Sequence, residues 1–246
     1  MSYLADMFGL AGRTAVVTGG SSGIGRDIAL ALESAGATVA VVARRATPPV
    51  AIPHYFSADL GDRSAVASVI DRIRDAHGDP DILVNSAGIN RRPPMDSLTL
   101  DDWDATLAAN LTAPFLLGQA FGPRMAARGW GRIINVVSQQ AFRAYGNSGA
   151  YGASKGGLVA LTRSQAEAWS RHGVCCNAIA PGVVHTPLTE AVFADEAKVA
   201  AHAARTMIGR NGVPEDFGAC AIFLASAACA AVTGQTLFVD GGYSAT

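Results

Sequence analysis

The sequence has little charge, few aromatic residues and no basic cluster. Charged residues make up 16% of the 246 residues and aromatic residues 7%, and the formal net charge is −1. The lysines and arginines are scattered along the chain, which leaves no basic stripe to neutralise the phosphates of a nucleic acid. We therefore expect no nucleic-acid partner.

Cysteine is also scarce, and the first ten residues do not resemble a secretory signal. The four cysteines are Cys175, Cys176, Cys220 and Cys229, of which two are neighbours and all lie in apolar stretches. Small buried thiols explain this arrangement better than disulfides do. The N-terminal residues contain Asp6 but no basic segment leading into an apolar core. These features predict a cytoplasmic protein.

Apolar runs of membrane-spanning length are missing as well. Residues 217–232 carry no charge, but this stretch is shorter than a membrane span requires and is rich in alanine. We expect a buried helix there and no membrane association. Hydrophobic residues, at 50%, and glycine, at 27 residues, are by contrast abundant. This composition is typical of an α/β domain around a covered sheet, and we expect one domain spanning residues 1–246.

Short apolar runs rich in β-branched residues alternate with helical patterns along the chain. Uninterrupted apolar runs predict strands covered on both faces, and a helix is predicted from Gly23 towards Ser34. Right-handed crossovers then give a Rossmann-type doubly wound parallel sheet of about seven strands with helices on both faces, which binds ligands at the carboxyl ends of its strands. The predicted strands are residues 14–17, 38–42, 81–84, 132–137, 174–179 and 236–239, with a further strand ahead of Asp59.

One segment departs from this alternation. Between Val42 and Tyr55 the sequence contains three prolines, Pro48, Pro49 and Pro53, and no helical period. Proline interrupts a helix because it lacks the N–H donor and its ring clashes with the preceding turn. We therefore predict a crossover without a helix at residues 43–54.

A glycine-rich loop follows the first predicted strand. Residues 18–25 are Thr-Gly-Gly-Ser-Ser-Gly-Ile-Gly, and a helix is predicted to begin at the end of this loop. Glycine permits a tight turn and close approach to a pyrophosphate, whose charge is attracted by the N–H groups of the helix N-terminus. Glycines also build ordinary loops, but the flanking strand and helix supply the context of a dinucleotide site. The loop residues expected to bind the cofactor are Gly19, Ser21, Ser22, Gly23, Ile24 and Gly25.

The residues after the second strand bear on the choice between NAD and NADP. Ala43 stands where a carboxylate would hold the ribose 2′-hydroxyl of NAD, and Arg44 and Arg45 follow it. The arginines predict binding of a 2′-phosphate and hence NADP rather than NAD, with two solvated side chains as the alternative. Asp59 is expected either to accept a hydrogen bond from the adenine amino group or to cap a helix.

Tyr151 and Lys155 are four residues apart, so their side chains share one side of a helix. A neighbouring ammonium group is expected to favour the phenolate and to lower the pKa of Tyr151. This spacing alone also fits a surface pair. Ser138, however, follows the strand at 132–137 at the carboxyl edge of the sheet, where its hydroxyl can position a substrate oxygen.

Together these features resemble the short-chain dehydrogenase/reductase family over residues 13–242, nearly the whole chain. Ser86 departs from the family pattern, and the usual helix between the second and third strands is missing. The matching motifs are the glycine loop, Asn85-Ser86-Ala87-Gly88, Asn110, Ser138, the pair Tyr151 and Lys155, Pro181-Gly182 and Thr186. The resemblance implies further cofactor contacts from Asp59, Leu60, Asn85, Ala87, Gly88, Tyr151, Lys155, Pro181, Gly182 and Thr186.

The resemblance also implies a mechanism. Hydride would pass between the nicotinamide and a carbonyl or carbinol carbon, while Tyr151 gives or takes the proton on oxygen. Lys155 would hold the nicotinamide ribose and Ser138 the substrate oxygen, and Asn110 would organise a water-linked proton path. A homotetramer is expected as in the family, and no metal ligand is expected.

The substrate end of the site is expected to be polar, which favours a sugar acid, sugar or polyol. Residues 183–212 are expected to form a variable lid, and His185 is expected in packing or solvent contact. The residues expected to contact the substrate are Asn90, Arg91, Gln139, Gln140 and Asn147, with Arg92 as a second candidate beside Arg91.

The sequence also has features of other functions. Residues 88–92 are similar to gluconate 5-dehydrogenases and keto-deoxy-gluconate dehydrogenases, whereas Gly146-Asn147 is similar to 3-oxoacyl carrier-protein reductases. Reduction of a 3-oxoacyl thioester is therefore the alternative reaction. A nucleotide sensor or scaffold that has lost its chemistry, or a purely structural oligomer, is a further alternative, against which the intact Ser138, Tyr151 and Lys155 argue.

Overall fold

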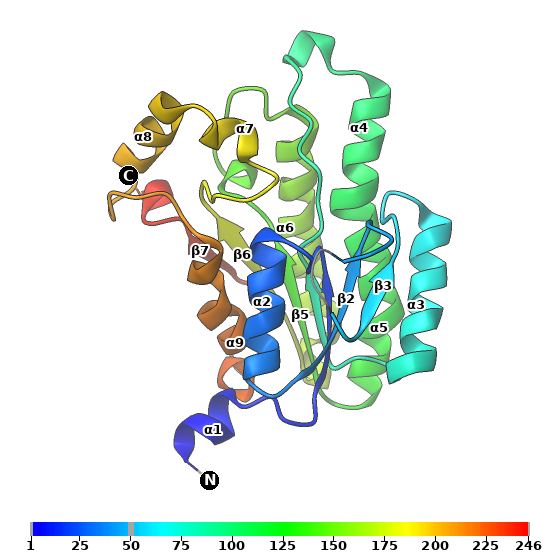
Figure 1. Cartoon of the computed structure of the whole chain (residues 1–246). Coiled ribbons are helices and arrows are strands. Elements are labelled where there is room, and N and C mark those ends of the chain that lie inside the picture. The colour runs from blue at the N-terminus through cyan, green and yellow to red at the C-terminus, as the bar shows by residue number, and fades with distance from the viewer. Residues whose placement is uncertain (1, 49–51, 246) are drawn as a thin grey trace.

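The computed structural model describes residues 2–48 and 52–245, and within them seven strands form one parallel sheet (Figure 1). Their order is β3-β2-β1-β4-β5-β6-β7. The chain places β2 and β3 on one side of β1 and then crosses back to place β4 on the other side, so the strand order switches at β1 and β4. The strands are β1 (Thr14–Thr18), β2 (Thr38–Ala43), β3 (Tyr55–Ser57), β4 (Ile82–Asn85), β5 (Gly131–Val136), β6 (Val174–Pro181) and β7 (Thr236–Val239). The predicted strands are confirmed to within one or two residues at each end.

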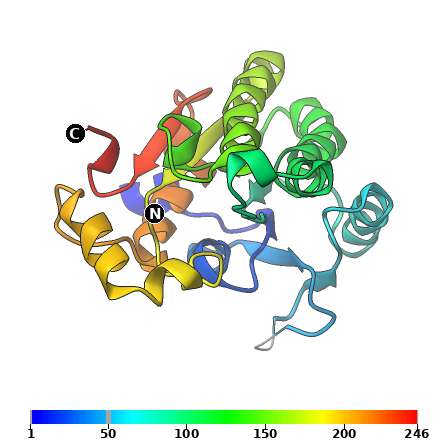
Figure 2. The ribbon, with the colours of Figure 1, turned by 90° about the horizontal axis from the view of Figure 1, so that it is seen from above.

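Helices cover both faces of the sheet because the strands are apolar on both faces. One face packs against α2 (Gly23–Ser34) and α9 (Gly218–Ala225), and the other against α3 (Arg63–His77), α5 (Ala113–Ala127) and α6 (Gly149–Trp169) (Figures 1 and 2). In β1, the fully buried Val17 joins the core on the α2 side, and the neighbouring Val16 joins the core on the α3 and α5 side. The predicted doubly wound Rossmann-type sheet is thereby confirmed.

The crossover from β2 to β3 contains no helix in its described residues, 44–48 and 52–54. The prediction for this segment is confirmed there, whereas its residues 49–51 lie outside the described part of the chain. Two side chains of β3 bond to the backbone of the crossover. Tyr55 Oη donates to the carbonyl oxygen of Arg45 at 2.7 Å, and Ser57 Oγ donates to that of Arg44 at 3.5 Å.

The uncharged stretch at 217–232 forms α9 and a short 3-10 helix, η6 (Ala227–Cys229), with Ser226 between them. Phe217, Ala221 and Leu224 are buried against α2 and the sheet, so the predicted buried helix is confirmed for α9. None of the helices within the described residues is long and apolar enough to cross a membrane.

The four cysteines are free thiols, as predicted, and three of them are buried. Burial raises the pKa of Cys220 and of Cys229 to about 11 in each case. These thiols are therefore protonated at neutral pH, and they serve as small apolar groups in the core.

The segment after β6 leaves the sheet as an excursion that carries two helices, α7 (Glu190–Phe193) and α8 (Glu196–Ala204). An isolated parallel bridge between Val184 and Gly212 closes the base of this excursion. Figure 2 shows it, in gold, beside the C-terminal turn η7 (Tyr243–Ala245), in red. His185 stacks on Phe193 with ring centroids 4.4 Å apart, which confirms its packing role.

Candidate functional site

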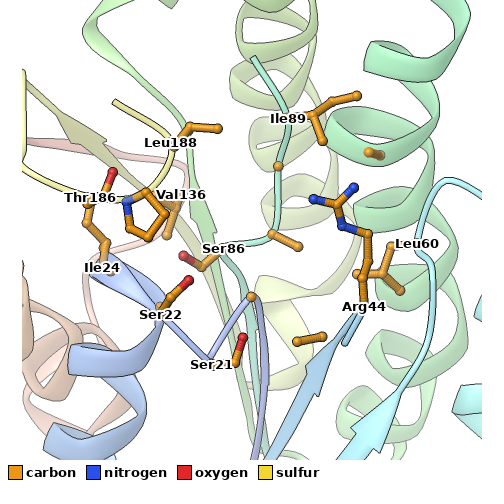
Figure 3. A pocket seen from close by; sticks show the side chains of 18 of the residues that line it. Ser21, Ser22, Ile24, Arg44, Leu60, Ser86, Ile89, Val136, Thr186 and Leu188 are labelled. Carbon is orange, nitrogen blue, oxygen red and sulfur yellow. The ribbon is translucent and has the colours of Figure 1, made fainter. Parts of the chain in front are cut away.

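A cleft of about 610 Å³ opens at the carboxyl ends of the strands (Figure 3). It is lined by sixteen of the seventeen residues expected to bind the cofactor, namely Gly19, Ser21, Ser22, Gly23, Ile24, Gly25, Arg44, Asp59, Leu60, Ala87, Gly88, Tyr151, Lys155, Pro181, Gly182 and Thr186. The sequence motifs, although spread over some 170 positions, therefore meet in one place, as the topology of a parallel sheet requires.

Asn85 is the one expected cofactor residue that does not line the cleft. It is the last residue of β4 and is buried, and its Nδ2 donates to Oδ1 of Asn135 on β5 at 2.8 Å. Its side chain therefore ties two strands together inside the sheet. The next residue, Ser86, lines the cleft instead. The alternation of side chains along a strand explains this one-residue difference.

The glycine loop has the geometry of a phosphate cradle. Gly19 has φ +70°, and a Cβ there would lie 2.9 Å from the backbone of Ala87, so no larger residue fits. Ser22, the N-cap of α2, makes no side-chain cap hydrogen bond, and the first turn of α2 contains no acidic residue. The N–H groups of this helix end are therefore available to an anion from the cleft, which fits a bound pyrophosphate.

The end of the cleft next to β2 carries positive charge. Arg44 and Arg45 both line it, and Figure 3 shows the Arg44 side chain rising from the end of β2 beside Leu60, across the cleft from Thr186. Asp59 also lines the cleft, and its Oδ1 accepts a hydrogen bond from the N–H of Gly61 at 2.9 Å. The alternative prediction that Asp59 caps a helix is wrong, because Asp62 is the N-cap of α3.

Tyr151 and Lys155 project from α6 into the other end of the cleft, where Ser138 follows β5. All three side chains are buried. Lys155 Nζ donates to the carbonyl oxygen of Val136 at 2.8 Å and lies 5.8 Å from the centre of the Tyr151 ring. The strand end thus orients the lysine towards the tyrosine, so the two residues do not form the surface pair considered as an alternative.

Burial dominates the electrostatics of this group. Burial raises the pKa of Tyr151, against the lowering effects of a hydrogen bond with Ser138 and of the charge of Arg92. The groups that lower the pKa of Tyr151 are thus Ser138 and Arg92. Lys155, which was expected to lower this pKa, is not one of them. Burial also lowers the pKa of Lys155 to about 8. The site therefore contains a neutral phenol next to an ammonium group that loses its proton more readily than an exposed lysine.

Asn110 lies in a π-helical turn, η2 (Ala108–Thr112), between α4 (Leu100–Leu107) and α5. Its Oδ1 accepts from the N–H of Ile89 at 2.8 Å, and its Nδ2 donates to the carbonyl oxygen of Ile89 at 2.9 Å and to Ser154 Oγ at 3.1 Å. Asn110 therefore fastens the loop after β4 to α6. π-Turns of this kind frequently occur at functional sites.

The structure separates the five residues expected to contact substrate. Arg91 lines the cleft but forms an ion pair with Asp102 at 2.8 Å. Gln139 and Gln140 line a second cavity of about 260 Å³. Asn90 and Asn147 line neither cavity. Asn147 is exposed with φ +56°, a turn conformation that asparagine tolerates, so its sequence position reflects backbone geometry.

Sequence patterns did not identify several residues around these cavities. Ile89, Val184, Leu188 and Thr189 line the cleft, and Arg143, Tyr145, Arg205 and Tyr243 line the second cavity. Arg205 and Tyr243 follow no motif and come from a distant helix end and the C-terminal turn. Only the tertiary fold brings them near Ser138.

Comparisons with known proteins identify the family. A short-chain dehydrogenase family model described as Enoyl-(Acyl carrier protein) reductase matches residues 19–244. Gluconate 5-dehydrogenase of Gluconobacter oxydans is 38% identical, with 96% of each chain covered. D-threitol dehydrogenase of Mycolicibacterium smegmatis is 40% identical, with 96% of this chain and 95% of that protein covered.

A solved structure agrees with these relatives. The crystal structure of a gluconate 5-dehydrogenase from Burkholderia cenocepacia in complex with NADP and tartrate superposes with a TM-score of 0.93 and 38% identity, covering 99% of this chain and 100% of that chain. The chain therefore belongs to the short-chain dehydrogenase/reductase family and is an NAD(P)-dependent oxidoreductase that acts on CH–OH groups.

Proposed function

We propose that the enzyme interconverts the carbinol and carbonyl of a small sugar acid, sugar or polyol, with NADP as the preferred cofactor. The observation that carries this proposal is the meeting of Ser138, Tyr151 and Lys155 in the cleft that begins at the glycine loop. The sugar-acid and polyol dehydrogenases among its relatives support this substrate class over 3-oxoacyl thioesters. The Gly146-Asn147 similarity adds little to the thioester alternative, since it lies in an exposed turn.

Each residue of the group has a proposed role. The bound nicotinamide dinucleotide supplies the hydride acceptor for oxidation and the hydride donor for reduction. For oxidation, Tyr151 first loses its own proton to water, and its phenolate then takes the hydroxyl proton of the substrate. For reduction, the neutral phenol gives its proton to the carbonyl oxygen, and in both directions Ser138 holds the substrate oxygen beside Tyr151. Lys155 binds the ribose hydroxyls of the cofactor with the N–H donors that Val136 leaves unused. Asn110 keeps the loop after β4 in place through Ile89.

We further propose that residues 1–246 form one domain, that 183–212 act as a lid over the substrate, and that the enzyme is a cytoplasmic homotetramer. The excursion closed at Val184 and Gly212 supports a lid, because its base is fixed while its helices extend beyond the sheet. The edge strand β7 exposes Leu237 and Phe238, which supports a subunit contact. The free cysteines fit a reducing compartment.

A substrate panel tests the proposed function. Initial rates are measured for the wild-type enzyme with aldonates, neutral polyols and 3-oxoacyl thioesters, each with NADP(H) and NAD(H). We expect the highest kcat/KM for an aldonate or a polyol with the NADP couple. Far faster turnover of a 3-oxoacyl thioester would contradict the proposed substrate class.

The two neighbouring arginines after β4 are expected to contribute unequally to substrate binding. Arg91 is already paired with Asp102. Arg92 forms no ion pair with a described residue, although its guanidinium donates to the carbonyl oxygen of Gly146, and its positive charge opposes the rise that burial causes in the pKa of Tyr151. Arg92→Ala should therefore raise KM about tenfold or more for both aldonates and polyols, since a charged hydrogen bond contributes roughly 1.5–3 kcal/mol. Arg91→Ala should change KM only about twofold, because solvent-exposed ion pairs contribute little. Equal KM values for the two variants would refute this assignment.

Lys155→Met is expected to weaken NADP binding and to lower kcat, because the ammonium group proposed to hold the nicotinamide ribose also fixes where the cofactor lies relative to Tyr151. A second readout follows from the pKa. Burial lowers the pKa of Lys155 from 10.5 to about 8, so the unfolded chain binds more protons than the folded chain between these values. The wild type should therefore gain stability relative to Lys155→Met as the pH rises from about 8 to about 10. Thermal unfolding of both proteins at several pH values measures this difference, and a parallel pH dependence would contradict it.

A further inference from the structure

The second cavity, which we call the arginine cavity, lies next to Ser138. It is lined by Gln139, Gln140, Arg143, Ala144, Tyr145, Arg205 and Tyr243. These residues come from the 3-10 helix η3 (Gln139–Ala141) with its following loop, from the end of α8 and from η7. Gln139 directly follows Ser138, and the N–H of Gln140 donates to Ser138 Oγ at 3.2 Å. Ser138, which lines the cleft, is therefore hydrogen-bonded to a residue that lines the arginine cavity, so a substrate oxygen held by Ser138 lies beside this cavity.

Positively charged side chains surround a partly buried tyrosine and histidine at this cavity. Tyr145 Oη and His202 Nε2 are hydrogen-bonded at 2.7 Å. The Arg92 guanidinium lies 4.7 Å from the centre of the Tyr145 ring, and both Arg92 and Arg205 lower the pKa of Tyr145, although burial raises it overall. Burial lowers the pKa of His202, and the charges of Arg205 and Arg92 lower it further. The histidine therefore stays neutral and does not repel the two arginines.

No carboxylate compensates this charge within the described residues. The ion pairs found there use other basic residues, and none involves Arg92 or Arg205. Asp240, the acidic residue nearest in sequence to η7, accepts hydrogen bonds from the N–H groups of Gly242 and Ser244. The guanidinium of Arg205, which forms no ion pair with a described residue, favours an anion in this cavity, and its planar fork matches a carboxylate.

Arg205 is oriented for such a contact. Its guanidinium lies over the ring of Tyr243, 4.3 Å from the ring centre. Stacking uses the face of the guanidinium and leaves the N–H donors around its edge for an anion. Arg143, by contrast, donates to the carbonyl oxygen of Ser244. We therefore attribute anion binding to Arg205 and not to Arg143.

The side-chain amide of Gln139 indicates which ligand group would lie beside the anion. The Gln139 side chain is only 2% exposed, and its Oε1 has no hydrogen-bond partner although the residue lines the cavity. A buried polar atom without a partner is unfavourable in free energy. A hydroxyl group both donates and accepts, so it satisfies the amide whichever way the side-chain oxygen and nitrogen are placed. The cavity thus offers one site for an anion and one for a hydroxyl.

We propose that the arginine cavity binds the carboxylate end of an aldonate substrate, with Arg205 holding the carboxylate and Gln139 a hydroxyl beside it. The carbinol at the other end then lies at Ser138 and Tyr151. This inference rests on the proposed function and adds the orientation of the substrate. It makes Arg205 a residue that selects acids over neutral polyols.

The test compares an aldonate with the neutral polyol of the same chain length. Arg205→Gln should raise KM for the aldonate about 10- to 100-fold, the loss of one charge-assisted hydrogen bond of roughly 1.5–3 kcal/mol. KM for the polyol and Kd for NADP should stay within about threefold of wild type, and Arg205→Lys should recover part of the aldonate affinity because it retains the charge. The control is Arg171→Gln, which changes an exposed arginine in η4 (Ser170–His172), beyond the opposite end of α6.

The outcomes separate the two proposals. If Arg205→Gln raises KM equally for the aldonate and the polyol, or changes neither, the carboxylate assignment is overturned while the proposed function stands. If the wild type turns over neither compound, the proposed function fails, and the orientation of the substrate fails with it. A loss confined to the aldonate, with partial recovery in Arg205→Lys and none in the Arg171 control, supports the inference.

Discussion

Tyr151→Phe is expected to lower kcat by at least about a hundredfold while NADP affinity stays close to wild type. The substitution removes the group that exchanges a proton with the substrate oxygen, and general acid–base catalysis typically contributes about 10²–10⁴-fold. The phenylalanine ring fills the same buried space beside Lys155 and Ser138, so the fold should be preserved. Steady-state kinetics and a fluorescence titration with NADPH measure the two quantities.

A matched substitution controls for indirect effects at this position. Ser138→Ala removes the neighbouring hydroxyl, which hydrogen-bonds to Tyr151, but leaves the proton-exchanging phenol in place. It should lower kcat less than Tyr151→Phe does. If Tyr151→Phe retains activity within a few-fold of wild type, proton transfer cannot depend on this phenol.

Arg44→Ala is expected to weaken NADP binding by about ten- to a hundredfold and to leave NAD binding nearly unchanged. Arg44 lines the cleft at the end of β2, where Ala43 supplies no carboxylate to repel a phosphate. Loss of one charge-assisted hydrogen bond, roughly 1.5–3 kcal/mol, sets this magnitude. Titration of wild type and variant with both cofactors measures it.

Arg45 provides the comparison for this experiment. It also lines the cleft, and its carbonyl oxygen is held by Tyr55. The side chains of Tyr55 and Ser57 donate hydrogen bonds to the carbonyl oxygens of Arg45 and Arg44. These bonds hold the backbone after β2 in place, where no crossover helix does so, and they fix the direction of Arg44. Arg45→Ala should therefore have the smaller effect. Equal or tighter binding of NAD than of NADP by the wild type would show that both arginines are solvated and select neither cofactor.

Much of the fold follows from short-range patterns. Residues 14–17 and 132–137 place Val, Ile or Ala at consecutive positions, and a strand covered on both faces buries such residues, so β1 and β5 could be predicted although the second run also contains Arg132 and Asn135. The glycine loop was equally informative, since the strand predicted before it and the helix predicted after it give its glycines the context of an anion site. The parallel topology then places the motif residues in one cleft.

The substrate end was less predictable for a physical reason. Asn147 and Gln139 both lie between Ser138 and Tyr151 in sequence, yet one occupies an exposed left-handed turn and the other is buried in the arginine cavity. Loop geometry decides between these positions, and no periodicity encodes it. Arg205 and Tyr243 join the cavity only through tertiary packing, so no local pattern could assign them a role.

In the proposed reaction, hydride passes between the carbinol carbon of a polyhydroxylated substrate and the nicotinamide while Tyr151 transfers the proton. Isotope transfer measures this hydride step. The enzyme is incubated with NADP and an aldonate or polyol that carries deuterium on the reacting carbon, and the reduced cofactor is analysed by mass spectrometry. We expect one deuterium in each reduced cofactor formed by the wild type, and almost no reduced cofactor from Tyr151→Phe. Reduced cofactor without deuterium, or labelled cofactor formed equally fast by the variant, would contradict it.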